Sequence, residues 1–151
     1  MPKPKSVALL SGGLDSCVEP AYLGPLFEGE GGIDLRESHG QVCRLVDINL
    51  SQKNWPLLNG VKESYGGRLV HNANCWQWRC NRTADVINFL TLIHPYTVMQ
   101  FREIELALRL CYLILFCDGR NAQIQTFRLA IEKKFWAAKK LRKEGFMEPL
   151  Q

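Results

Sequence analysis

The sequence predicts an α+β domain in which an antiparallel four-stranded sheet packs under helices. Three observations support this class: strand-like segments come in two pairs, a helix-like segment separates the pairs, and the second half of the chain has mostly helical spacing. At 151 residues the chain has the size of one ordinary domain and can bury a core.

Alternation of apolar and polar residues defines the expected strands. The first pair covers residues 33–36 and 41–50, in which Ile33 and Leu35, and then Val42, Val46, Ile48 and Leu50, lie on one side of each strand. The second pair, residues 68–72 and 75–81, surrounds a short turn and is expected to form a hairpin. Because the alternating faces differ in polarity, one face of the sheet should be polar and partly basic.

Helical spacing covers most of the remaining chain. A helix over residues 53–65 is expected to end at Gly66-Gly67. After Arg82, one helix should run from Thr83 to a stop at Pro95, and a second from about Val98 to Phe116.

A long basic helix is expected after the break at Asp118-Gly119. Its buried face should carry Ile124, Phe127, Ile131, Phe135 and Ala138, and its exposed face should carry Lys133, Lys134, Lys139, Lys140, Arg142 and Lys143. The basic face has two interpretations: it is a solvated surface, or it contacts the backbone of DNA.

Composition narrows the function classes. A net charge of +4 permits a polyanionic partner without requiring one. The longest apolar stretch, residues 106–117, contains Arg109 and is too short for a membrane span, so no membrane partner is expected. The six cysteines include no CxxC pair, which predicts free thiols in a reducing compartment. The absence of a secretory signal pattern predicts a protein that is not secreted.

The segment 7–16, VALLSGGLDS, has a glycine-rich turn after an apolar strand. It resembles the phosphate loop of PP-loop ATP pyrophosphatases, in which backbone N–H groups would cradle pyrophosphate. Repeated βα units do not follow, and Pro20 interrupts the expected helix. A flexible N-terminal lead-in over residues 1–19 is the competing interpretation.

A second motif, residues 22–33, has the sequence YLGPLFEGEGGI. It resembles the signature of the LAGLIDADG homing endonucleases. Further similarity follows in the family's order, with residues 49–58, Gly66-Gly67, Trp76 to Arg79, residues 85–92, His94-Pro95-Tyr96 and residues 102–108. The resemblance covers about residues 20–116 and implies that family's fold there, followed by a C-terminal basic amphipathic helix within residues 117–151.

The motif has a physical meaning of its own. A short apolar helix over residues 22–28 would place Glu30 at its C-terminal end, where the helix dipole and free carbonyls favour a cation. A carboxylate and a carbonyl oxygen suit Mg²⁺. The resemblance implies that Glu30 and the carbonyl of Gly29 bind the metal and that Glu28 is mainly structural. Solvated turn residues are the alternative interpretation of both glutamates.

Only one copy of the motif is present, so the resemblance implies a homodimer with two motif helices packed on a two-fold axis. The expected dimer interface consists of Tyr22, Leu23, Pro25, Leu26 and Phe27. Pro25 replaces a small residue where the helices would approach most closely. If the helix starts as late as Tyr22, Pro25 falls in the first turn, where its missing N–H has no intrahelical partner.

Two further catalytic residues follow from the resemblance. Asn49 stands where the family often has a polar residue that orients the nucleophilic water, although a hairpin hydrogen bond would explain it equally. The family commonly has a basic residue at the positions that are Gln100 and Phe101 here, and Arg102 is the nearest cation. A solvated position on a helix is the alternative for Arg102.

The polar sheet face is expected to read double-stranded DNA. Arginine and glutamine distinguish base pairs in the major groove, and lysines neutralise phosphates. The candidates for base contacts are Arg36, Arg44, Arg68, Gln77 and Arg79, and those for phosphates are Lys53 and Lys62. Each has solvent exposure as its competing interpretation, and Trp55, Trp76 and Trp78 are expected in the core.

The sequence thus predicts a site-specific, Mg²⁺-dependent double-stranded DNA endonuclease that acts as a homodimer. A cleavage-deficient DNA-binding protein or an intron RNA maturase of the same fold is the second hypothesis, and a PP-loop pyrophosphatase fragment is the third. The resemblance favours an organelle-encoded protein of a chloroplast or mitochondrion, or a microbial cytoplasmic one.

Overall fold

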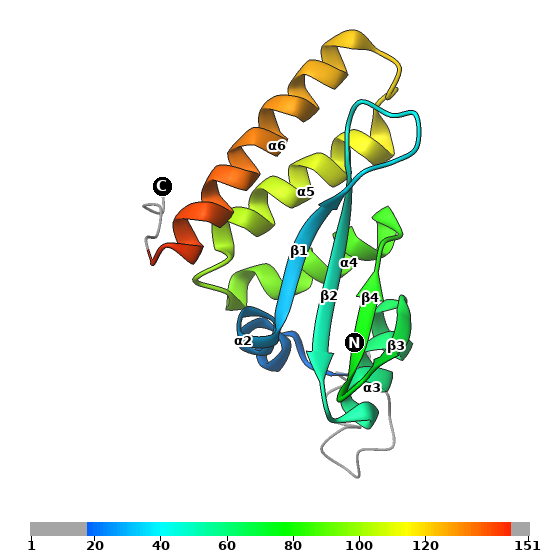
Figure 1. The fold of residues 1–151 in the computed structure, drawn as a ribbon, viewed down its shortest axis with the longest axis vertical. Helices are drawn as coiled ribbons and strands as arrows, with labels where there is room; N and C mark the ends of the chain where they lie inside the picture. Colours follow the sequence, from blue (N-terminus) through cyan, green and yellow to red (C-terminus); the bar gives the residue numbers. More distant parts are fainter. Residues whose placement is uncertain (1–17, 146–151) are drawn as a thin grey trace, which may run out of the picture.

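Four strands form one antiparallel sheet in the computed structural model, which describes residues 18–145. They are β1 (Gly31–Arg36), β2 (Leu45–Gln52), β3 (Arg68–Asn72) and β4 (Cys75–Cys80), in the spatial order β1-β2-β4-β3 (Figure 1). The predicted four-stranded antiparallel sheet is confirmed. The segment 7–16 and most of the expected lead-in lie outside the described residues.

Helices cover one face of this sheet and leave the other open (Figure 1). They are α2 (Pro20–Glu30), α3 (Trp55–Tyr65), α4 (Thr83–Ile93), the 3₁₀-helix η1 (His94–Tyr96), α5 (Phe101–Phe116) and α6 (Ala122–Lys143). The last two run side by side as a helical hairpin along the β1 side of the molecule. The α+β class expected from the sequence is therefore confirmed. Between residues 18 and 145, no helix has both the length and the apolarity that a bilayer span requires.

Local sequence explains the boundaries of α3. The Asn54 side chain accepts a hydrogen bond from the N–H of Leu57 at 3.2 Å and so caps the first turn. Gly66 ends the helix at φ 82°, a left-handed conformation that glycine adopts at little cost. Its carbonyl accepts from Nε1 of Trp78 at 2.7 Å, so the end of the helix is fixed against β4.

An aromatic cluster occupies the core between the sheet and the helices. The Phe89 ring lies 4.8 to 5.5 Å from the rings of Trp78, Tyr65 and Phe27, counted between ring centroids. The Tyr65 hydroxyl donates to the carbonyl of Val18 at 2.9 Å, which ties the start of the described chain to α3. Because Phe27 belongs to this cluster, the motif helix is anchored in the core.

Strand β2 begins later than the sequence suggested. It starts at Leu45 rather than Gln41, and Arg44 lies in the loop before it. The N–H of Arg44 donates to the Glu132 carboxylate at 3.1 Å, and its carbonyl accepts from Arg128 at 3.0 Å. Two backbone groups that a strand would use in the sheet are thus satisfied by side chains of α6.

The motif helix begins earlier than expected. It starts at Pro20, which occupies the first helical position, where a proline is well tolerated. Pro25 is therefore not in the first turn but inside the helix, and it removes one internal N–H donor. Glu19, before Pro20, is extended, so no helix runs through Pro20, in agreement with the sequence-based expectation.

The faces of α6 were predicted only in part. Phe135 and Ala138 are buried as expected, but Phe127 is 55% exposed. The buried side instead contains three charged residues, Arg128, Glu132 and Lys139. Each of them bonds to β1 or to the loop between β1 and β2, so their burial is offset by polar partners.

Candidate functional site

The open sheet face carries one row of polar side chains, which extends across β2, β4 and β3 and ends opposite Gly32 of β1. Gly32 of β1 pairs with Asn49 of β2, which pairs with Arg79 of β4, and Arg79 pairs with Arg68 of β3. Side chains at paired positions point to the same side of a sheet. The neighbouring positions on the strands, such as Ile48 and Trp78, are buried under the helices.

A shallow hollow of about 300 Å³ lies along this row. Three of the predicted base-reading residues, Arg68, Gln77 and Arg79, line it together with Asn49. Arg79 donates to Gln77 at 2.6 Å, and Gln77 donates to the Ser51 hydroxyl at 3.3 Å. These contacts orient the donors along the surface without burying them.

Two aspartates share the open face with the arginines. Asp47 pairs with Arg36 at 3.1 Å, and Asp34 pairs with Lys139 of α6 at 2.9 Å. The structure thus places Arg36 on the predicted face, but its charge is partly neutralised there. Among the described residues no carboxylate forms an ion pair with Arg68 or Arg79, so both add positive charge to this face.

Two predicted DNA-contact residues lie elsewhere. Arg44 lies in the loop before β2, and its guanidinium is paired with Glu37 at 3.2 Å and with Glu132 at 3.6 Å. Lys62 is exposed on α3, which covers the opposite face of the sheet. The assignment of these two residues to the DNA-reading face is therefore wrong. Lys62 lies on the other side of the sheet, and the Arg44 guanidinium is already bound by two carboxylates.

The C-terminal end of the motif helix opens into a second hollow, of about 320 Å³. Glu30 lines it together with Ser51, Gln52, Lys53 and Cys75. The strand register explains this grouping: Gly31 pairs with Leu50, so β2 continues past the end of α2 and carries its last residues toward Glu30. A carboxylate and an ammonium group thus border the same hollow at the end of the open face.

The sequence missed part of this grouping. Gln52 and Cys75 were not expected near Glu30, and Lys53 was expected only as a phosphate contact. Asn49 lies opposite Gly32 on the open face and does not line the hollow of Glu30. Arg102 lies in the first turn of α5 and pairs with Glu105 at 3.7 Å, again outside this hollow. The antiparallel register is the signal that could have identified Gln52.

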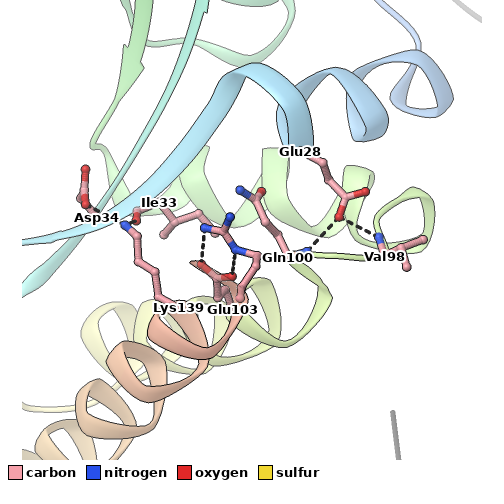
Figure 2. A network of polar contacts seen from close by, with 8 residues as sticks. Glu28, Ile33, Asp34, Val98, Gln100, Glu103 and Lys139 are labelled. Carbon is pink, nitrogen blue, oxygen red and sulfur yellow. Dashed lines mark hydrogen bonds and ion pairs between the residues drawn. The ribbon is translucent and has the colours of Figure 1, made fainter. Parts of the chain in front are cut away.

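Glu28 has a structural position. One of its carboxylate oxygens accepts hydrogen bonds from the N–H groups of Val98 and Gln100, both at 2.8 Å (Figure 2). It thereby fixes the segment before α5 against the motif helix. Gln100 is 2% exposed, and the Phe101 ring stacks on His94 with centroids 4.0 Å apart. Gln100 is thus too buried to contact a DNA backbone, and Phe101 has no polar group to offer one.

The outer face of the motif helix is apolar. Tyr22 is 56% exposed, Pro25 and Gly29 are exposed, and Leu26 is partly buried, at a spacing that places them on one side of the helix. Leu23 and Phe27 were predicted for the interface, but they are completely buried in the core of their own chain. These two assignments are wrong, because such side chains have no surface to offer a partner.

Gly24 holds the motif helix close to η1. A Cβ atom at this position would lie 2.6 Å from Cβ and 2.7 Å from the carbonyl oxygen of Tyr96. We expect Gly24→Ala to destabilise the fold by about 1 to 3 kcal/mol, because the backbone of η1 must move to admit the methyl group. Urea denaturation measures this loss. Gly29→Ala is the matched control, since a Cβ there meets no atom within 4 Å, and an equal loss in both variants would contradict the packing argument.

A polar network joins α6 to this region. Arg142 forms an ion pair and two hydrogen bonds with Glu103 of α5, whose side chain is 2% exposed. One turn earlier, Lys139 donates to the carbonyl of Ile33 at 2.5 Å as well as to Asp34 (Figure 2). The last turns of α6 therefore bind both β1 and the start of α5, close to the motif helix.

Cys75 is expected to react with alkylating reagents more readily than the buried cysteines. Burial raises the pKa of Cys80 and of Cys111 to about 12. At pH 8 only about one such thiol in ten thousand is ionised, and the thiolate is the reactive form. We expect iodoacetamide to alkylate Cys75 in the folded protein and to leave Cys80 and Cys111 unmodified, as read by peptide mass spectrometry. Rapid labelling of Cys80 or Cys111 without unfolding would contradict their burial.

The oxygen ligands at Glu30 suit a hard cation such as Mg²⁺ that keeps water or phosphate as its remaining ligands. Within residues 18–145, His, Cys, Asp and Glu side chains form no group of three that could hold a metal by themselves. Mg²⁺ commonly takes one or two carboxylates and completes its shell with waters and substrate phosphates. Glu30 and the carbonyls of the last helical turn, that of Gly29 included, match this mode of binding.

Comparisons with known proteins are informative at the level of structure. No family model matches the chain, and no curated protein matches its sequence. Among solved structures, the homing endonuclease I-CvuI in complex with the I-CreI target superposes with a TM-score of 0.67 at 12% identity, over 78% of this chain and 80% of that one. The archaeal intron-encoded homing endonuclease I-Vdi141I, complexed with DNA, gives a TM-score of 0.66 at 15% identity over 78% and 82%.

A longer protein shares the same architecture. The LAGLIDADG meganuclease I-AabMI, bound to uncleaved DNA, matches with a TM-score of 0.66 at 16% identity, over 87% of this chain and 51% of that chain. The present chain therefore corresponds to about half of I-AabMI. Four antiparallel strands under helices, with the motif helix at the end of the open face, are thus the fold of the LAGLIDADG homing endonucleases.

Proposed function

We propose that this protein is a site-specific double-stranded DNA endonuclease that acts as a homodimer and requires a divalent metal ion. The observation that carries the proposal is the position of Glu30. Its carboxylate is exposed at the end of an apolar helix and borders the same open face that presents Arg68 and Arg79. A carboxylate that could hold a metal ion and a surface that could bind nucleic acid are thus contiguous.

The open face has suitable chemistry for reading duplex DNA. Arg68, Gln77 and Arg79 present donors and an acceptor that can distinguish base pairs in the major groove, which is wide enough for a β-ribbon. The similar structures include several DNA complexes, which supports duplex DNA as the partner. Asp34 and Asp47 add acceptors to the same surface.

The homodimer is supported by the outer face of α2. Tyr22, Pro25 and Leu26 form an apolar strip, and Val98 and Met99 continue it beyond Glu28 as exposed apolar side chains. A second copy of the same helix would cover this strip by a two-fold contact and bring two Glu30 carboxylates together. Pro25 removes a backbone donor, but its side chain lies on the exposed surface and does not obstruct the core.

Metal binding at Glu30 would provide the hydrolytic chemistry. Mg²⁺ held there would activate water and neutralise charge on the scissile phosphate. Glu30 would hold the ion, and Lys53 in the same hollow would offer the positive charge that the buried Gln100 cannot supply. Gln52 would orient water in this hollow, a role that the sequence had suggested for Asn49.

Selection from a randomised duplex library tests the proposal. The protein should retain specific duplexes in Ca²⁺, sediment as a dimer of about twice 17.3 kDa, and cleave the selected duplexes when Mg²⁺ replaces Ca²⁺. A DNA-indifferent monomer would overturn the proposal. Tight binding with no cleavage in either Mg²⁺ or Mn²⁺ would favour the second candidate, a cleavage-deficient DNA-binding protein or intron RNA maturase.

One observation favours that second candidate. Where the family commonly has a basic residue, Gln100 is buried and Phe101 stacks on His94. If Lys53 does not replace the missing cation, cleavage would fail while the sheet still bound nucleic acid. A binding competition between the selected duplex and a structured intron RNA then distinguishes the two forms. Preference for the duplex would indicate a DNA-binding protein, and preference for the RNA would indicate a maturase.

A further inference from the structure

The positive charge of this protein is concentrated on one helix. Helix α6 holds seven lysines and arginines and one glutamate, a net charge of +6, whereas the rest of the chain holds twelve basic and fourteen acidic residues, a net charge of −2. The whole chain has a net charge of +4, so α6 is the main source of its attraction for polyanions.

Six of the seven basic residues of α6 fall into two groups, and the seventh, Lys134, is exposed on another side of the helix. Arg128, Lys139 and Arg142 point into the protein and are bonded to the loop before β2, to β1 and to α5. Lys133, Lys140 and Lys143 are exposed, and no carboxylate of the described residues lies within ion-pair distance of them. With Trp136, which is 39% exposed, these three lysines are here termed the α6 stripe.

The α6 stripe lies on the β1 side of the helix. Glu132 contacts the loop before β2, and Lys139 contacts β1. Successive residues of a helix are rotated by about 100°, so Trp136 and Lys143 lie next to Glu132 and Lys139 around its circumference. Phe135 and Arg142, by contrast, face α5 and the core. Trp136, Lys139, Lys140 and Lys143 also line a hollow of about 290 Å³.

Strand β1 is the edge of the sheet, and Lys139 connects it with α6. Its ammonium group bonds to the carbonyl of Ile33 and to Asp34 on the open face (Figure 2). Lys139 therefore joins the helix that carries the α6 stripe to the β1 edge of the open face. A duplex that lies across the strands and extends past β1 would come next to this stripe.

We propose that the α6 stripe is a second DNA-contact surface, which binds the phosphate backbone of duplex DNA that extends beyond the β1 edge of the sheet. This inference rests on the proposed function, because it takes duplex DNA on the open face as its starting point. Unpaired lysines suit phosphates as point charges without base specificity. The stripe would therefore add affinity and salt dependence rather than sequence recognition.

The charge arrangement supports an anionic occupant. Lys140 and Lys143 are three residues apart, a spacing at which like charges repel on a helix. The C-terminal helix dipole offsets part of this repulsion. A row of phosphates would neutralise the remaining charge, whereas an apolar or basic partner would not.

The test compares two double variants that each remove two exposed lysine charges. The first is Lys140→Gln with Lys143→Gln, within the α6 stripe. The control is Lys62→Gln with Lys134→Gln, on α3 and on the opposite flank of α6. Binding of the selected duplex is measured in Ca²⁺ over a series of salt concentrations, with duplexes of increasing length on both sides of the site.

We expect the stripe variant to lower the slope of log affinity against log salt by about 1.8, since each phosphate contact contributes about 0.9. The loss should appear only with duplexes that extend beyond the minimal site, and the control should match the wild type. If the stripe variant and the wild type gave equal slopes, this inference would be overturned. The proposed function would stand in that case, because the wild type would still bind the duplex. A loss confined to structured RNA would overturn it in favour of an RNA surface.

Discussion

Replacement of Glu30 by glutamine is expected to lower the rate of DNA cleavage by about a thousandfold or more, with duplex affinity in Ca²⁺ nearly unchanged. The substitution keeps the shape of the side chain and removes the negative charge that would hold a divalent cation. Glu30 is exposed and has no hydrogen-bond or ion-pair partner among the described residues. Its substitution should therefore cost little stability.

The rate is measured with the selected duplex in Mg²⁺ under single-turnover conditions. Glu28→Ala is the matched control, because that residue lies two positions away and bonds to Val98 and Gln100. Loss of this carboxylate leaves two N–H groups unpaired and should lower the free energy of unfolding by about 1 to 3 kcal/mol. Full cleavage activity of Glu30→Gln would remove the carboxylate from the mechanism and with it the endonuclease assignment.

The periodicity of the sequence was sufficient to predict the sheet. Residues such as Ile48 and Trp78 alternate with polar neighbours, so burial of one face determines which side each residue takes. Asn54 and Gly66 explain why the bounds of α3 were nearly correct. These signals are local, and local signals suffice where the side chains of one segment determine its structure.

The motif helix illustrates why other features could not be predicted. Its sequence PAYLGPLFEGE is apolar around most of its circumference, so no polar face indicates its orientation. Sequence reasoning therefore assigned both Tyr22 and Leu23 to the interface, although Leu23 is completely buried. Long-range contacts decide the orientation, among them that of Gly24 with Tyr96 of η1, which joins residues seventy-two positions apart.

Long-range polar partners account for the error in α6. Arg128, Glu132 and Lys139 occupy its buried side, where amphipathicity alone favours apolar residues. Their partners lie in β1 and in the loop before β2, about a hundred residues earlier. The same limit applies to the hollow at Glu30, because Gln52 and Lys53 reach it through the pairing register of β1 and β2.

Arg142→Met is expected to cost about 3 kcal/mol of the free energy of unfolding, the largest stability loss among the substitutions considered. It leaves the carboxylate of Glu103 buried without its cation, and removal of one partner of a buried ion pair typically costs 3–5 kcal/mol. We take the lower end of this range because the Arg142 side chain is 20% exposed. Urea denaturation with an unchanged m-value gives the loss.

The companion variants decide whether the ion pair or the side-chain volume is responsible. Lys143→Met, next in the sequence but exposed, should change the stability by less than about 0.5 kcal/mol. The double variant Arg142→Met with Glu103→Leu should recover most of the loss, because replacing both partners of a buried pair by apolar residues is often neutral. If Arg142→Met alone costs less than about 1 kcal/mol, the last turn of α6 does not hold the start of α5.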